Sequence, residues 1–302
     1  MSYEKQVSLL IDLLNFVGEK QEFALKGGTA INLFYFDMPR LSIDIDLVYL
    51  PIKERRDTLR GISEALKELA INIKKTIPTI SIVYLPPSPS DTVRQLLCTL
   101  GRIQVKIEVN IVIRGTLYET QIKALCPSAQ KMFGKYAEIQ AVSKEDLYGS
   151  KMCAALDRQH PRDLFDMMLY FREHSITQEL KNAFIFYLLS HNRPIAEVLN
   201  PTRLDLSTLY KTDFMGMTSL AITLDDLYKT REALIQSIYR ALSPQDKEFI
   251  LSFKAGVPKW FLCAQPKLEQ MPSVQWKLLN IKNMDSKKRL QAYEKLKQLF
   301  DL

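Results

Sequence analysis

Two aspartates, Asp44 and Asp46, stand two positions apart in the apolar segment "SIDIDLVYL". In a β-strand, side chains at positions i and i+2 point to the same face and lie roughly 7 Å apart. Two carboxylates this close repel each other, and a divalent cation such as Mg²⁺ is the usual partner that removes the repulsion. The spacing therefore predicts a metal-binding strand that could assist phosphoryl chemistry.

A glycine pair, Gly27 and Gly28, precedes this strand. Glycine has no Cβ, so its backbone N–H group can approach a phosphate closely. The following residues have the pattern of a helix, whose N-terminus carries a partial positive charge, and we expect Thr29 to be its N-cap and to donate its hydroxyl to a phosphate oxygen. A glycine turn, a helix and then an Asp-x-Asp strand predict a triphosphate cradle beside a metal site.

The elements that must position these groups form an α/β pattern up to about residue 140. The clearest strand, "RIQVKIEVNIVIR", alternates apolar and polar residues, which places Ile103 to Ile113 on one face and Glu108 on the other. The predicted elements of this half are helices over 5–20, 29–34 and 53–69, strands over 23–25, 43–50, 71–85 and 102–114, and a loop at 86–90.

From Ser143 onward the pattern is almost entirely helical, with clear helix-start signals. Ser143 and Thr223 each open a capping box, and Ser243 precedes a proline at the first helical position. We therefore expect an α/β (α+β) N-terminal domain with a mixed sheet over residues 1–140 and an α-helical C-terminal domain over residues 141–302.

Composition narrows the class of protein. The chain has 302 residues, 47% apolar and 25% charged, which suits two domains with ordinary cores. No apolar run approaches the roughly 20 residues of a membrane span, and the N-terminus does not resemble a signal peptide. Four scattered cysteines suit a reducing cytoplasm and argue against a structural zinc site. The net charge of +7 favours polyanionic partners, and the last helices are the most basic.

The motifs and their order resemble the nucleotidyltransferase superfamily, and more narrowly the AbiEii/AbiGii-type toxin family, which includes the mycobacterial MenT toxins. The resemblance is strong over about the first 170 residues and loose beyond them. It implies a nucleotidyltransferase fold whose helical domain completes the nucleotide and acceptor cleft. The similar segments are "LKGGTAINL" at 25–33, "RLSIDIDL" at 40–47, "VKIEVN" at 105–110 and "KMCAALDRQHPRDLFDM" at 151–167.

The resemblance implies that Asp44 and Asp46 bind Mg²⁺ or Mn²⁺. It makes Glu108, on the polar face of a neighbouring strand, the candidate for a third metal ligand. The competing interpretation is that Glu108 belongs to a solvated strand face together with Gln104 and Lys106.

The same resemblance assigns residues to the NTP. Lys151 would neutralise triphosphate charge, Arg162 would grip a phosphate, and Asp163 would orient one of these cations or contact the base or ribose. The competing interpretation is a surface salt-bridge cluster at a helix junction. The residues expected to contact the NTP are Gly27, Gly28, Thr29, Ser42, Lys151 and Arg162.

The implied activity is transfer of an NMP from an NTP to a hydroxyl group, with release of pyrophosphate. The resemblance implies a cytoplasmic toxin of a type IV toxin–antitoxin or phage-defence system, with a cognate antitoxin encoded nearby and RNA, in particular the tRNA 3′ end, as acceptor. Two alternatives remain open: the same chemistry on a small molecule such as an aminoglycoside or on a protein side chain, and a non-catalytic NTP-binding protein.

Overall fold

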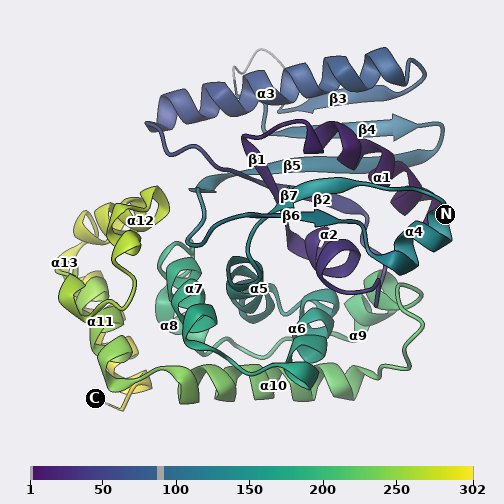
Figure 1. Ribbon diagram of the computed structural model, residues 1–302. Coiled ribbons are helices and arrows are strands. Elements are labelled where there is room, and N and C mark those ends of the chain that lie inside the picture. The colour runs from purple at the N-terminus through teal and green to yellow at the C-terminus, as the bar shows by residue number, and fades with distance from the viewer. Residues whose placement is uncertain (1–2, 87–91, 302) are drawn as a thin grey trace. The chain divides into compact units, whose positions relative to one another are not determined.

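The structure, a computed structural model, describes residues 3–86 and 92–301, and its contacts divide the chain into two compact units (Figure 1). The first unit comprises Met1–Leu147 together with Gly216–Leu220, and the second comprises Tyr148–Met215 together with Ala221–Leu302. The division falls inside helix α5 (Lys144–Arg158). The loop expected at 86–90 lies, except for its first residue, outside the described residues.

The first unit is built on a seven-stranded sheet with the strand order β3-β4-β5-β2-β1-β7-β6. Strands β2 and β5 are parallel, as are β1 and β7, while the other neighbours are antiparallel. The predicted mixed sheet in an α/β unit is therefore confirmed. The strands are β1 (Phe23–Lys26), β2 (Asp44–Tyr49), β3 (Ser81–Leu85), β4 (Gln95–Leu100), β5 (Ile103–Arg114), β6 (Gln121–Ala124) and β7 (Glu138–Ala141).

Helices α1 and α3 contact each other and both contact the sheet, with α3 running along β3 and β4 (Figure 1). The apolar residues of β5, Val105, Ile107 and Val109, are buried, while Lys106 and Glu108 on the opposite face are partly exposed. The polar groups of the sheet are thus separated from its core face. The helices of this unit are α1 (Tyr3–Gly18), α2 (Gly27–Ala30), the π-helix η1 (Ile31–Tyr35), α3 (Arg55–Thr76), α4 (Pro127–Phe133) and the start of α5.

The alternation predicted for the whole of β5 holds only as far as Asn110. There the register with β2 shifts, so that Tyr49 pairs with Arg114 instead of continuing in step. The Asn110 side-chain oxygen accepts hydrogen bonds from the backbone N–H groups of Val112 and Ile113, both at 2.9 Å. This local turn chemistry breaks the alternation. Arg114 becomes buried, at 8% exposure, and the predicted apolar face through Ile113 is wrong beyond this point.

The strand predicted over 71–85 is largely a helix. Helix α3 continues to Thr76, and only Ser81–Leu85 forms strand β3. Leu66, Leu69 and Ile73 are fully buried and follow the helical spacing i, i+3, i+7, which extends the core-facing stripe past the predicted helix end.

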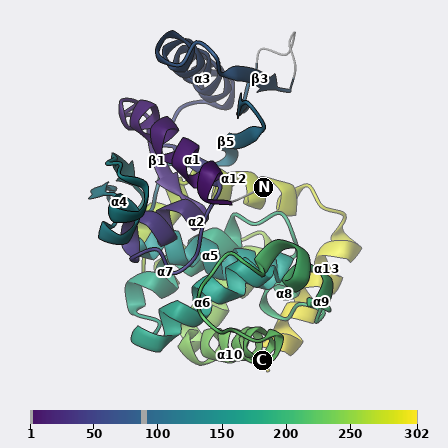
Figure 2. The same cartoon turned by 90° about the vertical axis from the view of Figure 1, so that its right-hand side faces the viewer.

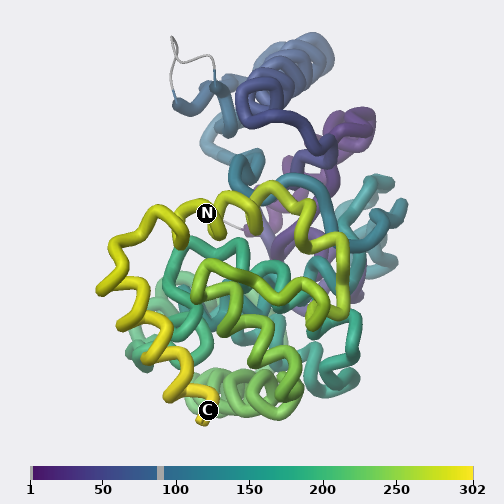
Figure 3. Tube along the Cα trace, turned by 90° about the vertical axis from the view of Figure 1, so that its left-hand side faces the viewer, coloured from purple at the N-terminus to yellow at the C-terminus, as the bar shows by residue number. Residues whose placement is uncertain are grey.

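The second unit is helical, as predicted. Helix α10 packs along α6 (Figure 2), and α11, α12 and α13 follow one another toward the C-terminus (Figure 3). No helix in the described part of the chain is long and apolar enough to cross a membrane. The helices are α6 (Pro161–Glu173), α7 (Gln178–Leu189), α8 (Ile195–Leu199), α9 (Ser207–Leu209), η2 (Tyr210–Phe214), α10 (Leu224–Ala241), α11 (Pro244–Ala255), η3 (Trp260–Leu262), η4 (Pro266–Gln270), α12 (Pro272–Lys282) and α13 (Ser286–Leu299).

The helix starts predicted at Ser143, Thr223 and Ser243 are found in the structure. Thr223 forms a full capping box at α10, and Ser243 forms one at α11 with Pro244 at the first helical position. At α5, the Ser143 hydroxyl accepts the backbone N–H of Asp146 at 3.0 Å. Such caps depend on residues within one helical turn, which is why they can be read from sequence.

Candidate functional site

Gly27, the first residue of the glycine pair, lies directly against Asp46. Gly27 follows β1 with φ of +72°, and a Cβ built there would lie 2.5 Å from the Asp46 Oδ2 atom. A Cβ at Gly28 would lie 2.7 Å from the Arg40 guanidinium and 3.1 Å from the Ser42 hydroxyl. At Gly27 the positive φ and the close approach both favour glycine, whereas a side chain at Gly28 would require Arg40 or Ser42 to move.

Thr29 is not the N-cap that the sequence predicts, and its predicted contact with a phosphate stays a prediction. Helix α2 begins at Gly27 with Lys26 as N-cap, so the prediction of Thr29 as N-cap is wrong. Thr29 is 1% exposed, and its hydroxyl lies 2.5 Å from the Asp44 carbonyl and 2.9 Å from the Ser42 hydroxyl. A carbonyl only accepts, so Thr29 donates to Asp44 and Ser42 donates to Thr29. The Thr29 proton is therefore not available to a phosphate in this arrangement; Thr29 instead fixes the start of β2 against α2.

The register of the sheet brings five charged side chains onto one face. Asp44 pairs with Lys106 and Asp46 with Glu108 across the parallel strands, and Lys26 pairs with Asp46 across the antiparallel pair. Directly opposite residues in neighbouring strands share a face and lie close together. Three carboxylates and two lysines thus form a charged surface over β1, β2 and β5, adjoining the Gly27 turn.

Lys106 lies among the three carboxylates of this surface. Its ammonium forms an ion pair with Glu108 at 2.9 Å. Burial lowers the pKa of Lys106, but the net shift is upward because the Glu108 hydrogen bond and the charges of Asp44, Glu108 and Asp46 outweigh that effect. In the described parts of the chain, no group of three or more His, Cys, Asp or Glu side chains is arranged to hold a metal ion. Glu108 as a third metal ligand therefore stays a prediction, and here it binds Lys106.

The donor set nevertheless fits a divalent cation. Asp44 and Asp46 are both partly exposed, occupy one face of one strand and supply the hard carboxylate oxygens that Mg²⁺ prefers. Two carboxylates with further ligands from substrate phosphates are a common Mg²⁺ arrangement. Lys106 engages one oxygen of Glu108, so Glu108 could join them through its other oxygen or by releasing Lys106.

A second cluster lies in the helical unit, around Lys151 of α5. The Lys151 ammonium lies 2.8 Å from Asp163 and 3.0 Å from Asp166, both on α6. All three side chains are at most 6% exposed. The Arg158 guanidinium, with 61% of its side chain exposed, binds the other oxygen of Asp163 at 2.8 Å. Lys151 is therefore already paired with two carboxylates, and its contact with a triphosphate stays a prediction.

Asp163 is held ionised by these cations. Burial would raise the pKa of its carboxyl, but the charges of Lys151 and Arg158, the Lys151 hydrogen bond and His160 together shift the pKa below its usual range. Asp163 thus orients two cations in the structure, which is one of the two roles expected for it.

The turn between α5 and α6 sets this geometry. Gln159 is buried, with φ of +50°, and its side chain binds the Thr202 carbonyl at 2.7 Å and the Arg231 guanidinium at 2.9 Å. His160 caps α6 by accepting the backbone N–H of Arg162 at 3.2 Å, which requires an unprotonated ring nitrogen. Burial, followed by the charge of Arg162, lowers the pKa of His160 and favours that neutral form.

Arg162 itself is half-buried on α6. Its charge acts on His160 and Asp213, but no hydrogen bond or ion pair of its side chain is present among the residues that the structure describes. A phosphate contact from Arg162 stays a prediction.

Sequence reasoning missed two members of these clusters. Lys106 was assigned only to a solvated face, although its spacing of two residues from Glu108 on a strand placed the two side by side. Asp166 was not singled out, although it stands three residues after Asp163 on the same helix and therefore on the same face.

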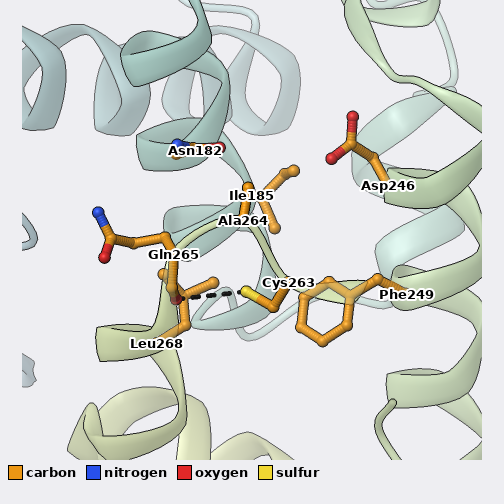
Figure 4. Close-up of a pocket in the computed structure, with 8 residues that line it drawn as sticks. All are labelled: Asn182, Ile185, Asp246, Phe249, Cys263, Ala264, Gln265 and Leu268. Carbon is orange, nitrogen blue, oxygen red and sulfur yellow. Dashed lines mark hydrogen bonds between the residues drawn. The ribbon is translucent and has the colours of Figure 1, made fainter. Parts of the chain in front are cut away.

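A recess elsewhere in the helical unit contains none of the predicted site residues (Figure 4). The Cys263 thiol on its wall donates to the Gln265 carbonyl at 3.3 Å. Its lining residues are Asn182, Ile185, Asp246, Phe249, Cys263, Ala264, Gln265 and Leu268.

Comparison with known proteins identifies the class. The fold is that of a nucleotidyltransferase toxin: the structure is similar to MenT4, a nucleotidyltransferase toxin from Mycobacterium tuberculosis H37Rv, with a TM-score of 0.61 and 13% sequence identity over 92% of this chain and 93% of that chain. The family described as "Nucleotidyl transferase AbiEii toxin, Type IV TA system" matches residues 8–280, and this chain belongs to that family. No curated protein matches the chain.

Proposed function

We propose that this nucleotidyltransferase toxin transfers an NMP from an NTP to RNA, in a Mg²⁺-dependent reaction whose acceptor is the 3′ end of tRNA. The observation that carries the proposal is the contact between the Gly27 turn and the Asp46 carboxylate, beside Asp44 on the same strand face. Nucleotidyl transfer requires a turn that phosphate can approach and carboxylates that hold a divalent cation, and the contact brings these two parts together.

The residues of the sheet would have separate roles in the reaction. When bound, a divalent cation would neutralise charge that develops on the phosphate oxygens. Asp44 and Asp46 would hold it, and Gly27 and Gly28 would present backbone N–H groups to the triphosphate. Lys106 keeps the carboxylate cluster partly neutralised in the free protein, because it pairs with Glu108.

The helical unit is proposed to supply cations. Lys151 and Arg162 would bind triphosphate oxygens, and Asp163 would keep Lys151 and Arg158 in position, as its two ion pairs indicate. Because Lys151 is paired with carboxylates in the free protein, we propose that nucleotide binding exchanges at least one of its contacts.

An RNA acceptor is supported by charge. The net charge is +7, and helix α13 exposes Lys287 and Lys288, while Arg289 beside them is half-buried. Cations that bind RNA phosphates release counterions, so affinity falls steeply as salt rises. A small cationic acceptor such as an aminoglycoside would not bind through these basic residues, so replacing them would not change the salt dependence of its binding.

The test is incubation with each of the four α-labelled NTPs, Mg²⁺ and total cellular RNA, followed by gel electrophoresis. We expect a labelled tRNA band and loss of labelling at high salt. Replacing Lys287, Lys288 and Arg289 together by glutamine should flatten the salt dependence without altering turnover at saturating RNA. Label on a small molecule or on the protein, with none on RNA, would contradict the proposed acceptor.

A further inference from the structure

A buried arginine lies outside both clusters described above. Arg114 ends β5 and is 8% exposed. Its Nη1 atom donates to the Thr58 hydroxyl at 3.3 Å, in the first turn of α3. Among the described residues, this is the one hydrogen bond of the guanidinium, its buried Nε atom has no acceptor, and no carboxylate lies within ion-pair distance. A buried charge without an ion pair is costly to the folded protein.

The surroundings of Arg114 make that cost larger. Helix α3 has 22 residues, and the N-terminus of a helix carries a partial positive charge that favours anions. Burial and then the charge of Arg55 lower the pKa of Arg114, while Glu54 acts in the opposite direction. The guanidinium, the Arg55 side chain and the helix terminus therefore place three positive features together. The N-cap residue, Glu54, makes no capping hydrogen bond that would offset them.

The exposed surface of this turn is also basic. Arg56 and Lys53 lie beside Arg55 and are exposed. The Asp57 carboxylate, in the first turn, is engaged by Arg60 at 2.9 Å. Basic residues therefore outnumber the two acidic residues of this turn, Glu54 and Asp57, and the Arg114 guanidinium reaches the turn through its bond to Thr58.

We propose that Arg114 and the first turn of α3 form a binding site for a phosphate-type anion, and that the anion is a phosphodiester of the RNA acceptor. Arg114 pairs with Tyr49, the last residue of β2, whereas Asp44 is the first, so the two sites lie roughly 17 Å apart along the strand. At that separation the site would hold the acceptor backbone, not the nucleotide being transferred. This part of the proposal rests on the proposed RNA acceptor.

The stability of one variant separates a ligand site from a structural arginine. Arg114→Met removes the buried charge and keeps much of the apolar stem. If Arg114 serves a ligand, the melting temperature of the variant should be unchanged or higher, because an unmatched buried charge is lost. If Arg114 holds β5 against α3, the melting temperature should fall, and the proposal would be wrong.

Binding is measured with full-length protein and labelled tRNA. We expect Arg114→Met to raise the dissociation constant about tenfold, the size of effect of losing charge-assisted hydrogen bonds. The matched control, Arg56→Met, removes an exposed cation from the same turn and should raise it much less. In the transfer assay, Arg114→Met should raise KM for RNA and leave both kcat and the affinity for NTP unchanged.

A titration with inorganic phosphate tells whether the site takes a phosphodiester of RNA or a free phosphate-type anion. Phosphate should raise the melting temperature of the wild type more than that of Arg114→Met. If it does so while the two proteins bind tRNA equally, the site takes a free anion and the phosphodiester assignment is wrong. If neither phosphate nor tRNA responds to Arg114→Met, the whole site is refuted. Because binding is read directly, a wild type that binds tRNA but labels no RNA would refute the proposed function and leave the anion site standing.

Discussion

Replacing Lys151 by methionine should strongly destabilise the helical unit, although it removes a single side chain. In the wild type the Lys151 ammonium contacts the carboxylates of Asp163 and Asp166, whose side chains are 4% and 0% exposed. Methionine fills a similar volume but supplies no charge. Asp163 would keep its contact with Arg158, whose side chain is largely exposed and therefore screened by water.

The magnitude follows from the burial of the partners. Removing one member of a buried ion pair costs about 3–5 kcal/mol, because the remaining charge is left in a low-dielectric interior. The loss should depend on pH. In the wild type the Asp163 pKa is lowered, so its contribution to stability is present above the unfolded pKa of about 3.9 and lost as the pH falls through the lower folded pKa. In the variant, burial would instead raise this pKa, so the folded state would bind more protons than the unfolded state over the whole range from about pH 4 up to the raised pKa. The deficit should therefore shrink between pH 7 and pH 5.

The assay is urea unfolding followed by circular dichroism at both pH values. Lys287→Met is the matched control, because Lys287 is exposed on α13, and it should leave the unfolding midpoint unchanged. Lys151→Met combined with Asp166→Asn should recover part of the loss. A Lys151→Met variant as stable as wild type at pH 7, or a loss that does not change with pH, would refute the assignment of Lys151 as the cation of this cluster.

Three further predictions concern single residues. Gly27→Ala should displace the Asp46 carboxylate and abolish NMP transfer. The control Gly101→Ala has a similar positive φ of +61° and open space around it, so it should cost only about 1 kcal/mol of stability and no activity. Equal activities of the two variants would contradict the claim that Gly27 must lie close to Asp46. Lys106→Met should tighten Mn²⁺ binding, measured by titration calorimetry, because a cation is removed from among the carboxylates; weaker binding would mean that Lys106 organises the site. Burial lowers the pKa of Lys277 to about 8, so between pH 8 and about 10.4 the unfolded chain binds more protons than the folded protein. The stability of the wild type, relative to that of Lys277→Met, should therefore rise with pH across this window. A difference in urea midpoint that stays constant with pH would refute this prediction.

The features that could be predicted from sequence are those set by near neighbours. The capping boxes of Thr223 and Ser243 involve residues one turn apart, and strand β2 is marked by its own composition. The Asp-x-Asp pair needed only the two-residue period of a strand to be placed on one face. The same reasoning failed for β5 where Asn110 turns its side chain onto the following backbone, because that interaction competes with the strand pattern.

Partner choice could not be predicted, because it depends on the tertiary structure. The Thr29 hydroxyl binds the carbonyl of Asp44, fifteen positions away, only because α2 packs on β2. Lys151 meets Asp163 through the turn at Gln159, whose positive φ is stabilised by side-chain bonds to distant residues. The resemblance identified Lys151 and Asp163 as candidates and implied that Asp163 orients a cation, but it did not decide which cation that is.

The central claim is that Asp44 and Asp46 carry nucleotidyl transfer, and the most direct measurement is pyrophosphate release by matched carboxylate-to-amide variants. Asp37→Asn is the control, since Asp37 accepts hydrogen bonds from the backbone N–H and hydroxyl of Ser128 and belongs to neither cluster. With NTP, Mg²⁺ and tRNA, we expect Asp44→Asn and Asp46→Asn each to reduce release by about 100-fold or more while keeping the wild-type circular dichroism spectrum, and Asp37→Asn to retain activity. Wild-type rates in folded Asp46→Asn protein would contradict the account.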